Sequence, residues 1–365
     1  MKIKFSYLDE QFRNPEPILA EIKRLVESGD FTLGKPLQEF ENSFAKLCGT
    51  KYAIGVGTGT DALRLSLIAL GIGKGDEVIT VPNTFYATAG AIATTGAKPV
   101  FVDVKEDYVI DTEKIQGAIT EKTKAIMPVH LYGKPANMPA IMKIAKENNL
   151  EVIEDACQGI TAEVDGKTVG SFGAAGGFSV HPLKGINVWG DGGIITTNSE
   201  AIREKLLLLR NHGLKSRDEC AVYGYNCRLD TLQAVVGNHI IKDVSRITEK
   251  RIGNAKYYDS ELSKIEGIAI PPRKKNEKEV YHTYVIRAEN RDGLLQHLIK
   301  NGIEAKVHYP IPLHLQEASK HLGYKKGDFP ETEAQAKSII TLPAHQYLKD
   351  EEREYIVKKI KEFYK

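Results

Sequence analysis

Apolar and polar residues follow two alternating patterns along much of the chain. Short apolar runs are typical of buried strands, and the stretches between them carry apolar residues at helical spacing. Helices lying between short apolar strands indicate a parallel, doubly wound sheet covered on both faces. The predicted strands are Lys51–Val56, Val78–Val81, Pro99–Val104, Ala125–Val129, Val152–Asp155, a run ending at Val180, and Ile194–Thr197.

The helical stretches lie before, between and after these strands. Two helices are expected between Pro15 and Leu47, separated by the Gly- and Pro-containing residues 28–36, which are typical of a loop. The other predicted helices are Thr84–Thr95, Thr112–Ile119, Met138–Glu147, Ser199–His212, one that begins near Asp230 and a long amphipathic one that ends near Lys264.

The last third of the chain has a different pattern, typical of a smaller α+β unit. It predicts a C-terminal helix from Asp350 and two loops rich in Pro, aromatic residues or His, one from Val307 onward and one at Ser338–His345. We therefore expect a large α/β domain over residues 1–240 and a small α+β domain over residues 241–365. The small domain is expected to contain strands at Val280–Arg287 and Glu304–His308 and a helix at Asp292–Asn301.

Composition excludes several classes of protein. A hydrophobic content of 42% and a charged content of 27% are those of a soluble globular protein. The net charge of +2 gives no basic excess for nucleic acid or an anionic membrane. The N-terminus lacks the apolar core of a signal peptide, and no apolar run is long enough to span a bilayer. These features predict a cytoplasmic protein.

Cysteine and histidine spacing gives no sign of a disulfide framework or a metal site. The four cysteines are widely separated and form no CxxC pair, so we expect reduced thiols. The ten histidines are scattered, with no H-x-x-x-H pair on a predicted helix.

One lysine lies between two predicted strands, in the stretch FSVHPLKGINVWGDGG. Lys184 lies on the predicted exposed turn, with Ser179 and His181 nearby and a Gly-rich segment, Gly190–Gly193, after it. A partly desolvated lysine at a sheet edge suits Schiff-base chemistry, which needs a neutral amine. A solvated loop lysine is the simpler interpretation, and this stretch alone favours it.

A Gly-rich turn, Gly57–Asp61, connects a predicted strand to a helix. Such a turn exposes backbone N–H groups at the positive end of the helix, which suits a phosphate. The alternative is that Gly59 makes a tight turn and Thr60 caps the helix. The local sequence does not separate these two interpretations.

Polar and aromatic residues follow the carboxyl ends of other predicted strands, where ligands bind in open α/β sheets. Phe85, His130 and Asp155 occupy such positions, and Gln158 follows Asp155 closely. Phe85 could instead belong to a helix core, and His130 could be a buried histidine with its hydrogen bonds satisfied. Asp155 is harder to explain structurally, because a carboxylate that ends an apolar strand is costly to bury without a partner. A protonated ring nitrogen would be such a partner.

A phosphate turn, an aromatic residue, a strand-end carboxylate and a strand-edge lysine together point to pyridoxal phosphate. The lysine would bind the aldehyde as a Schiff base, and the aspartate would keep the ring nitrogen protonated. The aromatic side chain would stack on the ring, and the turn would bind the phosphate. The cofactor itself supplies carbanion stabilisation.

The order of these segments resembles the sugar-nucleotide aminotransferases of the DegT/StrS type, which are fold-type I pyridoxal-phosphate enzymes. The resemblance covers nearly the whole chain and implies a large, doubly wound, mainly parallel sheet domain with a smaller C-terminal α+β domain. The motifs that carry it are GDFTLGKPLQEFE, GTGTDAL, GDEVITVPNTFYATA, GAKPVFVDV, PVHLYG, EVIEDACQ, FSVHPLKGINVWGDGGIITT, YNCRLDTLQA, HYPIPLH and LPAH.

The resemblance implies roles around the cofactor ring. Lys184 would be the Schiff-base lysine and, once released, the acid and base of the proton shift. Asp155 would pair with the pyridine nitrogen, Gln158 would lie near the ring hydroxyl, and Phe85 would stack on the ring.

The resemblance also implies a phosphate site built from two subunits. Gly59, Thr60 and Ser179 would hold the phosphate, with Asp61 in the same cofactor-binding turn. Asn226 occupies the position from which this family reaches the partner subunit's phosphate, so the enzyme would be an obligate homodimer. The residues expected to contact the sugar substrate are Arg228, His308 and Tyr309.

The implied reaction moves an amino group from L-glutamate to a keto-sugar nucleotide, with pyridoxamine phosphate as the intermediate form of the cofactor. The GDGG segment at Gly190–Gly193 resembles members that act on a 3-keto group, on a UDP- or dTDP-linked sugar. The product would be an amino sugar for lipopolysaccharide, another cell-surface polysaccharide or a related glycoconjugate. Alternatives are a 4-keto-sugar aminotransferase, a pyridoxal-phosphate-dependent sugar dehydratase, in which a histidine replaces the lysine, or a non-enzymatic regulator on the same scaffold.

Overall fold

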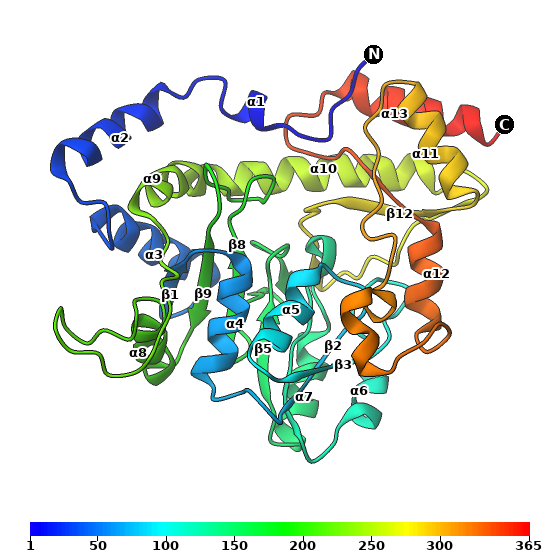
Figure 1. The fold of residues 1–365 in the computed structure, drawn as a ribbon. Coiled ribbons are helices and arrows are strands. Elements are labelled where there is room, and N and C mark those ends of the chain that lie inside the picture. Colours follow the sequence, from blue (N-terminus) through cyan, green and yellow to red (C-terminus); the bar gives the residue numbers. More distant parts are fainter.

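A seven-stranded sheet forms the centre of the molecule (Figure 1), and the computed structural model describes residues 1–365. The strand order is β1-β9-β8-β5-β4-β2-β3. Only β9 runs antiparallel to its neighbours, and all the other strand pairs are parallel. The expected mainly parallel α/β sheet is therefore confirmed. Its strands are β1 (Tyr52–Val56), β2 (Glu77–Thr80), β3 (Lys98–Phe101), β4 (Thr123–Ile126), β5 (Glu151–Asp155), β8 (Ala175–Ser179) and β9 (Gly193–Thr197).

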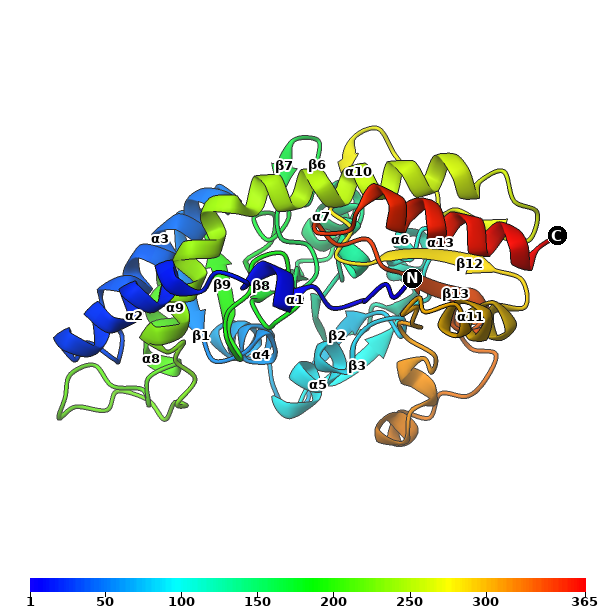
Figure 2. The same ribbon diagram turned by 90° about the horizontal axis from the view of Figure 1, so that it is seen from above.

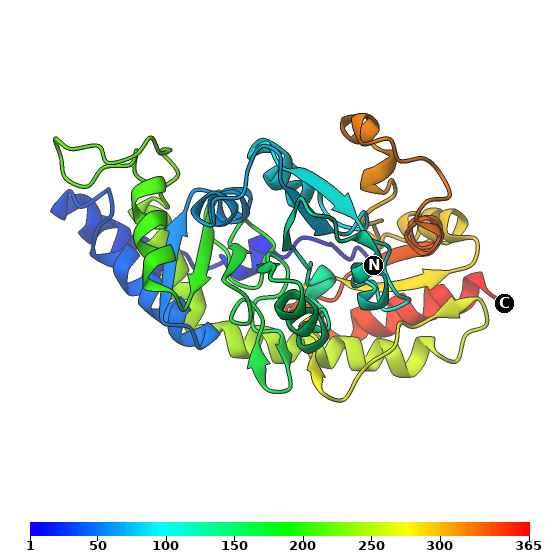
Figure 3. The same cartoon turned by 90° about the horizontal axis from the view of Figure 1, so that it is seen from below.

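Helices cover both faces of this sheet (Figures 1 and 3). Ile194 packs into a core beside α3 (Lys35–Cys48) and α9 (Thr231–Ile240), whereas its neighbour Ile195 packs into a core beside α4 (Gly59–Ala69) and α8 (Glu200–Leu209). Successive strand residues point to opposite faces, so two apolar residues in a row require two covered faces. The helices of this part are α1 (Leu8–Gln11), α2 (Glu16–Ser28), α3 (Lys35–Cys48), α4 (Gly59–Ala69), α5 (Tyr86–Thr94), α6 (Thr112–Ala118), α7 (Met138–Glu147), α8 (Glu200–Leu209) and α9 (Thr231–Ile240).

A second, three-stranded antiparallel sheet lies in the C-terminal third. It consists of β10 (Ile268–Ala269), β12 (Tyr284–Ala288) and β13 (Ile339–Leu342), in the order β10-β12-β13. Tyr258 and Tyr284 are fully buried in the core beneath it. The helices of this region are α10 (Val244–Leu262), α11 (Arg291–Lys300), α12 (Pro330–Ser338) and α13 (Asp350–Phe363).

The long helix α10 runs past both cores (Figure 2). Val244 and Ile247, at its start, pack with the core of the large sheet. Ala255 and Tyr258, further along, pack with the core of the small sheet. The expected domain boundary at residue 240 thus falls just before a helix that both cores share.

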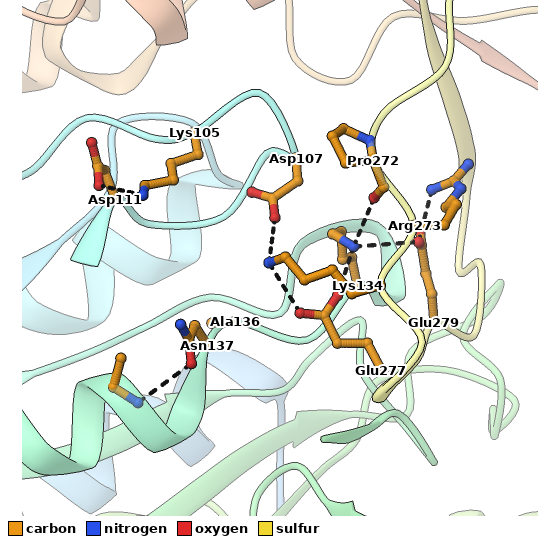
Figure 4. Close-up of polar contacts among 12 residues, drawn as sticks. Lys105, Asp107, Asp111, Lys134, Ala136, Asn137, Pro272, Arg273, Glu277 and Glu279 are labelled. Carbon is orange, nitrogen blue, oxygen red and sulfur yellow. Dashed lines mark hydrogen bonds and ion pairs between the residues drawn. The ribbon is translucent and has the colours of Figure 1, made fainter. Parts of the chain in front are cut away.

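A buried charge cluster also joins the two regions (Figure 4). The Lys134 ammonium lies 2.8 Å from the Glu277 carboxylate and 3.9 Å from Glu279, and it donates a 3.2 Å hydrogen bond to the carbonyl oxygen of Pro272. Residue Lys134 comes from the large-sheet region, and its partners lie on the segment before β12. Short strands connect the same regions, since β11 (Glu277–Lys278) pairs with β6 (Glu163–Val164), which pairs with β7 (Lys167–Thr168).

The structure differs from the sequence expectations mainly in the C-terminal third. The strand predicted at Glu304–His308 is wrong, because this segment makes only an isolated bridge between Lys306 and Thr341. The loop predicted at Ser338–His345 is wrong over its first half, where β13 pairs with β12. Helix α12 and the two-residue strands were not predicted, since they are short or polar and lack a clear apolar period.

Two further observations concern the whole chain. All four cysteines are free. No helix combines the length and the apolar character that crossing a bilayer would require.

Candidate active site

A cleft of about 1230 Å³ opens beside the carboxyl ends of strands in the large sheet. Its walls come from segments that follow β1, β2, β4, β5 and β8, together with residues from the C-terminal third. Ligands of open α/β sheets bind at this edge. Ten of the residues singled out from the sequence line the cleft: Gly59, Thr60, Phe85, Asp155, Gln158, Ser179, His181, Lys184, His308 and Tyr309.

Lys184 lies on the segment that connects β8 to β9 and is partly buried. The predicted exposed turn is exposed only in part, because His181 and Trp189 are exposed whereas Ile186 and Val188 are buried in the large core. The Lys184 carbonyl oxygen accepts hydrogen bonds from Tyr7 Oη and Asn187 Nδ2, each at 3.1 Å. Desolvation lowers the pKa of the Lys184 amine, and the nearby Cys157 and Asp155 oppose this effect. Burial thus favours the neutral amine that a nucleophilic lysine needs.

Asp155 ends β5 and is 5% exposed. Its Oδ2 accepts a 2.7 Å hydrogen bond from Thr88 Oγ1, and its Oδ1 accepts one of 3.2 Å from the Cys157 backbone N–H. These two donors hold the carboxylate at the cleft without neutralising its charge. A buried carboxylate held in this way is suited to a cationic partner, such as a protonated ring nitrogen.

The turn after β1 forms the N-terminus of α4. Thr58, and not Thr60, caps this helix, since Thr58 Oγ1 accepts a 2.9 Å hydrogen bond from the Asp61 N–H. The backbone N–H groups of Gly59 and Thr60, at the start of the helix, have no intrahelical acceptor and suit an anion. A Cβ on Gly59 would lie 2.7 Å from Ser179 Cβ, so glycine permits close contact between this turn and the end of β8.

Asp61 does not line the cleft. Its carboxylate pairs with Arg64 at 2.8 Å and accepts a 2.9 Å hydrogen bond from the Thr58 hydroxyl. The side chain therefore stabilises the turn that carries Gly59 and Thr60. Its contribution to a cofactor stays a prediction.

Phe85 and Gln158 are both neighbours of Tyr309. Phe85 precedes α5 and is 47% exposed, so it does not belong to a helix core. Its ring centroid lies 5.8 Å from that of Tyr309. Gln158 Nε2 donates a 3.1 Å hydrogen bond to Tyr309 Oη, and Gln158 Oε1 accepts one of 2.7 Å from the Tyr132 backbone N–H. Burial raises the pKa of Tyr309 to about 12, so this phenol stays protonated at neutral pH.

The two histidines named from the sequence have different environments. His308 lines the cleft, and burial together with Lys306 lowers its pKa to about 4. His130 is fully buried, accepts a hydrogen bond from the Ala136 N–H at 3.0 Å and contacts Glu154 at 3.1 Å. The interpretation of His130 as a satisfied buried histidine is confirmed.

Asn226 and Arg228 do not line the cleft of their own chain. They lie near the end of the segment between α8 and α9, part of which extends away from the body of the molecule (Figures 1 and 2). Asn226 is exposed, and the Arg228 guanidinium donates a 2.8 Å hydrogen bond to Asn211. Tyr223, on the same segment, is 100% exposed.

Three cleft residues had no signal in the sequence. Thr88 lies within α5, Cys157 follows Asp155, and His282 comes from the C-terminal third. Thr88 and His282 join the site through tertiary packing, whereas Cys157 lies there because it is only two residues from Asp155. The cleft brings together an amine, a carboxylate, a helix N-terminus and an aromatic ring. These groups fit pyridoxal phosphate. No group of three or more His, Cys, Asp and Glu residues in the structure could hold a metal ion.

Residues 14–361 match the model of the DegT/DnrJ/EryC1/StrS aminotransferase family. The chain belongs to this family. The expectation of an enzyme of the aminotransferase class is therefore confirmed, and the match extends over both cores. Family members among its relatives are named as transaminases of nucleotide sugars.

Several curated relatives align with almost the full chain. A pleiotropic regulatory protein of Geobacillus stearothermophilus is 43% identical over 100% of this chain and 99% of its own length. The dTDP-3-amino-3,4,6-trideoxy-alpha-D-glucose transaminase of Streptomyces venezuelae is 36% identical, covering 94% of this chain and 91% of its own. The UDP-N-acetyl-3-dehydro-alpha-D-glucosamine 3-aminotransferase of Acidithiobacillus ferrooxidans is 39% identical, covering 92% and 91%.

Solved structures confirm the fold. DesV of Streptomyces venezuelae has a TM-score of 0.96 at 35% identity, covering 100% of this aminotransferase and 98% of that chain. NtdA of Bacillus subtilis, solved with bound cofactor PMP, has a TM-score of 0.88 at 32% identity, covering 95% and 81%. The putative sugar aminotransferase Spr1654 of Streptococcus pneumoniae, in its PLP form, has a TM-score of 0.90 at 27% identity, covering 95% and 96%.

Proposed function

We propose that this aminotransferase moves the amino group of L-glutamate to the 3-keto group of a nucleotide sugar, with pyridoxal phosphate as its cofactor. The observation that carries the proposal is one cleft in which a lysine of lowered pKa and the buried carboxylate of Asp155 lie together. The solved relatives in PLP and PMP forms support the same cofactor here.

Lys184 is the proposed catalytic residue. Its desolvated amine is neutral in a larger fraction of molecules than an exposed lysine would be, so it can act as a nucleophile toward an aldehyde. Once released, the same amine can accept a proton from one carbon and return it to another. Pyridoxal phosphate, when bound, supplies the electron sink that stabilises negative charge at the reacting carbon.

The other proposed cofactor-binding residues position and polarise the ring. Asp155 would hold a proton on the ring nitrogen, and Thr88 fixes the Asp155 carboxylate with its hydrogen bond. Phe85 would cover one face of the ring, and Gln158 would lie near the ring hydroxyl. The N–H groups of Gly59 and Thr60, with the Ser179 hydroxyl, would bind the phosphate.

A 3-keto substrate is supported by the names of relatives with dTDP- and UDP-linked 3-amino sugars. The Gly190–Gly193 segment agrees with this choice. We propose that His308, Tyr309 and Arg228 contact the sugar nucleotide, the first two from the cleft and Arg228 from the partner subunit. The product would enter a lipopolysaccharide or another cell-surface glycoconjugate, and the proposed compartment is the cytoplasm. A 4-keto-sugar aminotransferase and a dehydratase remain alternatives, although the presence of Lys184 favours transamination over dehydration.

A homodimer is proposed as the active form. Asn226 is exposed and lies outside the cleft of its own chain, which suits a residue that reaches the phosphate of a second subunit. Exposed apolar side chains on the same segment, Val222, Tyr223 and Tyr225, support a contact there.

A regulatory function is the second candidate, because one relative is named a pleiotropic regulatory protein. The catalytic constellation argues against a purely regulatory role in this chain. A regulator has no need for a lysine of lowered pKa beside a buried, hydrogen-bonded carboxylate.

The deciding experiment compares the visible absorption spectrum of the purified protein with that of Lys184→Ala, before and after addition of L-glutamate. We expect a yellow band that L-glutamate bleaches in the wild type alone. Product analysis with 3-keto and 4-keto nucleotide sugars then identifies the acceptor. A colourless protein that does not take up pyridoxal phosphate would contradict the proposal.

A further inference from the structure

A second cavity adjoins the cleft. Gln158, Leu183, His282, His308 and Tyr309 line both spaces, so the cavity and the cleft share a wall. The far side of the cavity is closed by the N-terminal segment, through Phe5 and Tyr7, and by residues at the end of β13. A molecule held in the cleft would therefore border this cavity.

The cavity gathers polar atoms that have no hydrogen-bond partner in the chain. Nine buried side-chain nitrogen or oxygen atoms of the protein lack such a partner, and four of them belong to residues that line this one space. Burying such atoms without a partner costs free energy, so they indicate a polar occupant. The four atoms are Arg251 Nη2, His282 Nδ1, Thr283 Oγ1 and His345 Nδ1.

Arg251 is the charged member of this group. It lies on α10 and is only 3% exposed. Its Nη1 donates hydrogen bonds to the carbonyl oxygens of Tyr281 and His282, and its Nε donates one to Gln346 Oε1. No carboxylate lies within 4.0 Å of the guanidinium, and no acidic residue lines the cavity. A buried arginine without a carboxylate partner is suited to an anionic ligand.

The remaining basic groups of the cavity do not add positive charge at neutral pH. Burial lowers the pKa of His308 and of His345 to about 4 and lowers that of His282 well below its ordinary value. Arg251 is therefore the sole cation that lines the space, and the neutral histidines can serve as hydrogen-bond donors or acceptors.

The arginine also borders a space that reaches the reactive lysine. A small void has both Lys184 and Arg251 among its lining residues, together with His282. An anion beside Arg251 would thus belong to a molecule whose reacting end lies near Lys184. Of the two proposed substrates, the amino donor is the one that carries both a reacting amine and carboxylates.

We propose that this cavity binds a carboxylate of the amino-acid donor, through the Arg251 guanidinium and the Thr283 hydroxyl. The inference rests on the proposed aminotransferase reaction and adds the place at which the donor is recognised. Arg251 supplies the countercharge, and Thr283 supplies a hydrogen bond that no other group of the chain satisfies. The shared chemistry is a carboxylate, which can be the α-carboxylate or the side-chain carboxylate of L-glutamate.

The experiment measures the dissociation constant of glutarate, a dicarboxylate without an amine, for the pyridoxal-phosphate-loaded protein by calorimetry. Thr283→Val removes the hydroxyl and nearly keeps the shape, and we expect it to weaken glutarate binding by about tenfold. Its Tm should stay the same or rise, since no hydrogen bond within the chain is lost. Arg251→Met should weaken binding by about a hundredfold or more. Tyr108→Phe removes another buried hydroxyl without a partner, outside the cavity, and should leave glutarate binding unchanged.

The substitution at Thr283 keeps the inference testable if Arg251→Met fails to fold. If Thr283→Val binds glutarate as the wild type does, the inference is overturned, and water fills the cavity instead of a carboxylate. The lysine-bound cofactor band and its bleaching by L-glutamate are recorded on the same samples. If they are present while Thr283→Val binds glutarate normally, this inference alone fails, whereas an absent band contradicts the proposed function itself.

A comparison of amino donors assigns the carboxylate. The bleaching reaction gives an apparent affinity for each amino donor. If Arg251 and Thr283 bind the α-carboxylate, Thr283→Val should lower the apparent affinities for L-alanine and for L-glutamate by the same factor. If they bind the side-chain carboxylate, only the response to L-glutamate should weaken, or L-alanine should not react at all. Normal responses to both donors in Thr283→Val would overturn the inference.

Discussion

Two partly buried histidines that line the second cavity couple stability to pH. His308 lies near Lys306 and Lys184, and His345 lies near Arg251, and burial is the largest cause that lowers each pKa to about 4. The ordinary pKa of histidine is 6.5. Between these two values the unfolded chain binds protons that the folded protein does not bind. The free energy of unfolding therefore falls as pH drops from 7 toward 4.

We expect the protein to be less stable at pH 5 than at pH 7, by about 1–2 kcal/mol for each of these two histidines. Urea unfolding at the two pH values measures the difference. The His345→Gln side chain can keep the hydrogen bond to the Lys4 carbonyl oxygen but cannot titrate. Because only His308 of the two histidines then titrates, the part of the unfolding free energy that changes with pH should fall to about half. Equal pH dependence in the variant and the wild type would contradict this assignment.

At the scale of single residues, the sequence identified the groups whose chemistry has a local signal. Lys184 was named because it follows a strand in a Gly-rich segment, and Asp155 because a carboxylate ended an apolar strand. Thr88, His282 and Arg251 had no such signal. Each touches the site or its neighbouring cavity only because distant elements pack together.

At the scale of elements, the contact between the start of α4 and the end of β8 positions the proposed phosphate site. Gly59 lies so close to Ser179 that an added Cβ would meet the Ser179 Cα at 3.2 Å. Backbone atoms cannot move away as a flexible side chain can. The N-terminus of α4 would therefore have to shift away from β8.

We expect Gly59→Ala to lower the affinity for pyridoxal phosphate by about tenfold or more and to destabilise the protein by about 1–3 kcal/mol. Cofactor titration and thermal unfolding measure the two effects. The matched control is Gly90→Ala within α5, where an added Cβ meets nothing within 4 Å. This control should keep cofactor affinity and gain up to about 1 kcal/mol from helix propensity. If the Gly59→Ala variant binds pyridoxal phosphate as tightly as the wild type does, the close contact between Gly59 and Ser179 does not position the phosphate site.

Element predictions succeeded where apolar period and length were clear. All the strands of the large sheet were predicted, although the predicted ends of β3 and β4 lie three residues beyond the observed ones, and α7 was predicted with its observed bounds, Met138–Glu147. The strand expected at 304–308 is absent, and β13 was missed beside a Pro-containing motif. In both cases the partner strand decides the conformation, and a local pattern does not contain the partner.

At the scale of the whole molecule, the Lys134 cluster is a test of how the two regions are joined (Figure 4). Lys134 is 1% exposed, and Glu277 beside it is also buried. Removing the Lys134 ammonium would leave the Glu277 carboxylate with one cationic partner, the Lys274 ammonium, at 3.2 Å. A buried charge that loses one partner is destabilising.

We expect Lys134→Met to lower the free energy of unfolding by about 2–3 kcal/mol, measured by urea unfolding. Lys143→Met is the control, because Lys143 is exposed and its pair with the exposed Glu147, at 3.9 Å, should contribute less than about 1 kcal/mol. A second observation concerns cooperativity. If the proposed domains at 1–240 and 241–365 unfold separately in Lys134→Met, two transitions should replace one.

The proposed shared active site predicts rescue between inactive variants. Lys184→Ala and Asn226→Asp should each be inactive as homodimers. Mixed dimers, re-formed from equal amounts after mild dissociation, would contain one intact site, with Lys184 from one subunit and Asn226 from the other. We expect about a quarter of the wild-type activity in the mixture. No recovery, despite confirmed mixed dimers, would place Asn226 outside the partner's site.

The sequence by itself determined the fold class, the family and the groups that carry the proposed chemistry, because strand and helix periods and strand-end motifs are local properties of the chain. The tertiary structure alone decided which groups meet. It set the lowered pKa of Lys184 through burial, turned Asp61 away from the cleft toward Arg64, and brought Arg251 and Thr283 to a cavity beside the lysine. Burial, pairing and cavity walls depend on residues far apart in sequence, so no local pattern contains them.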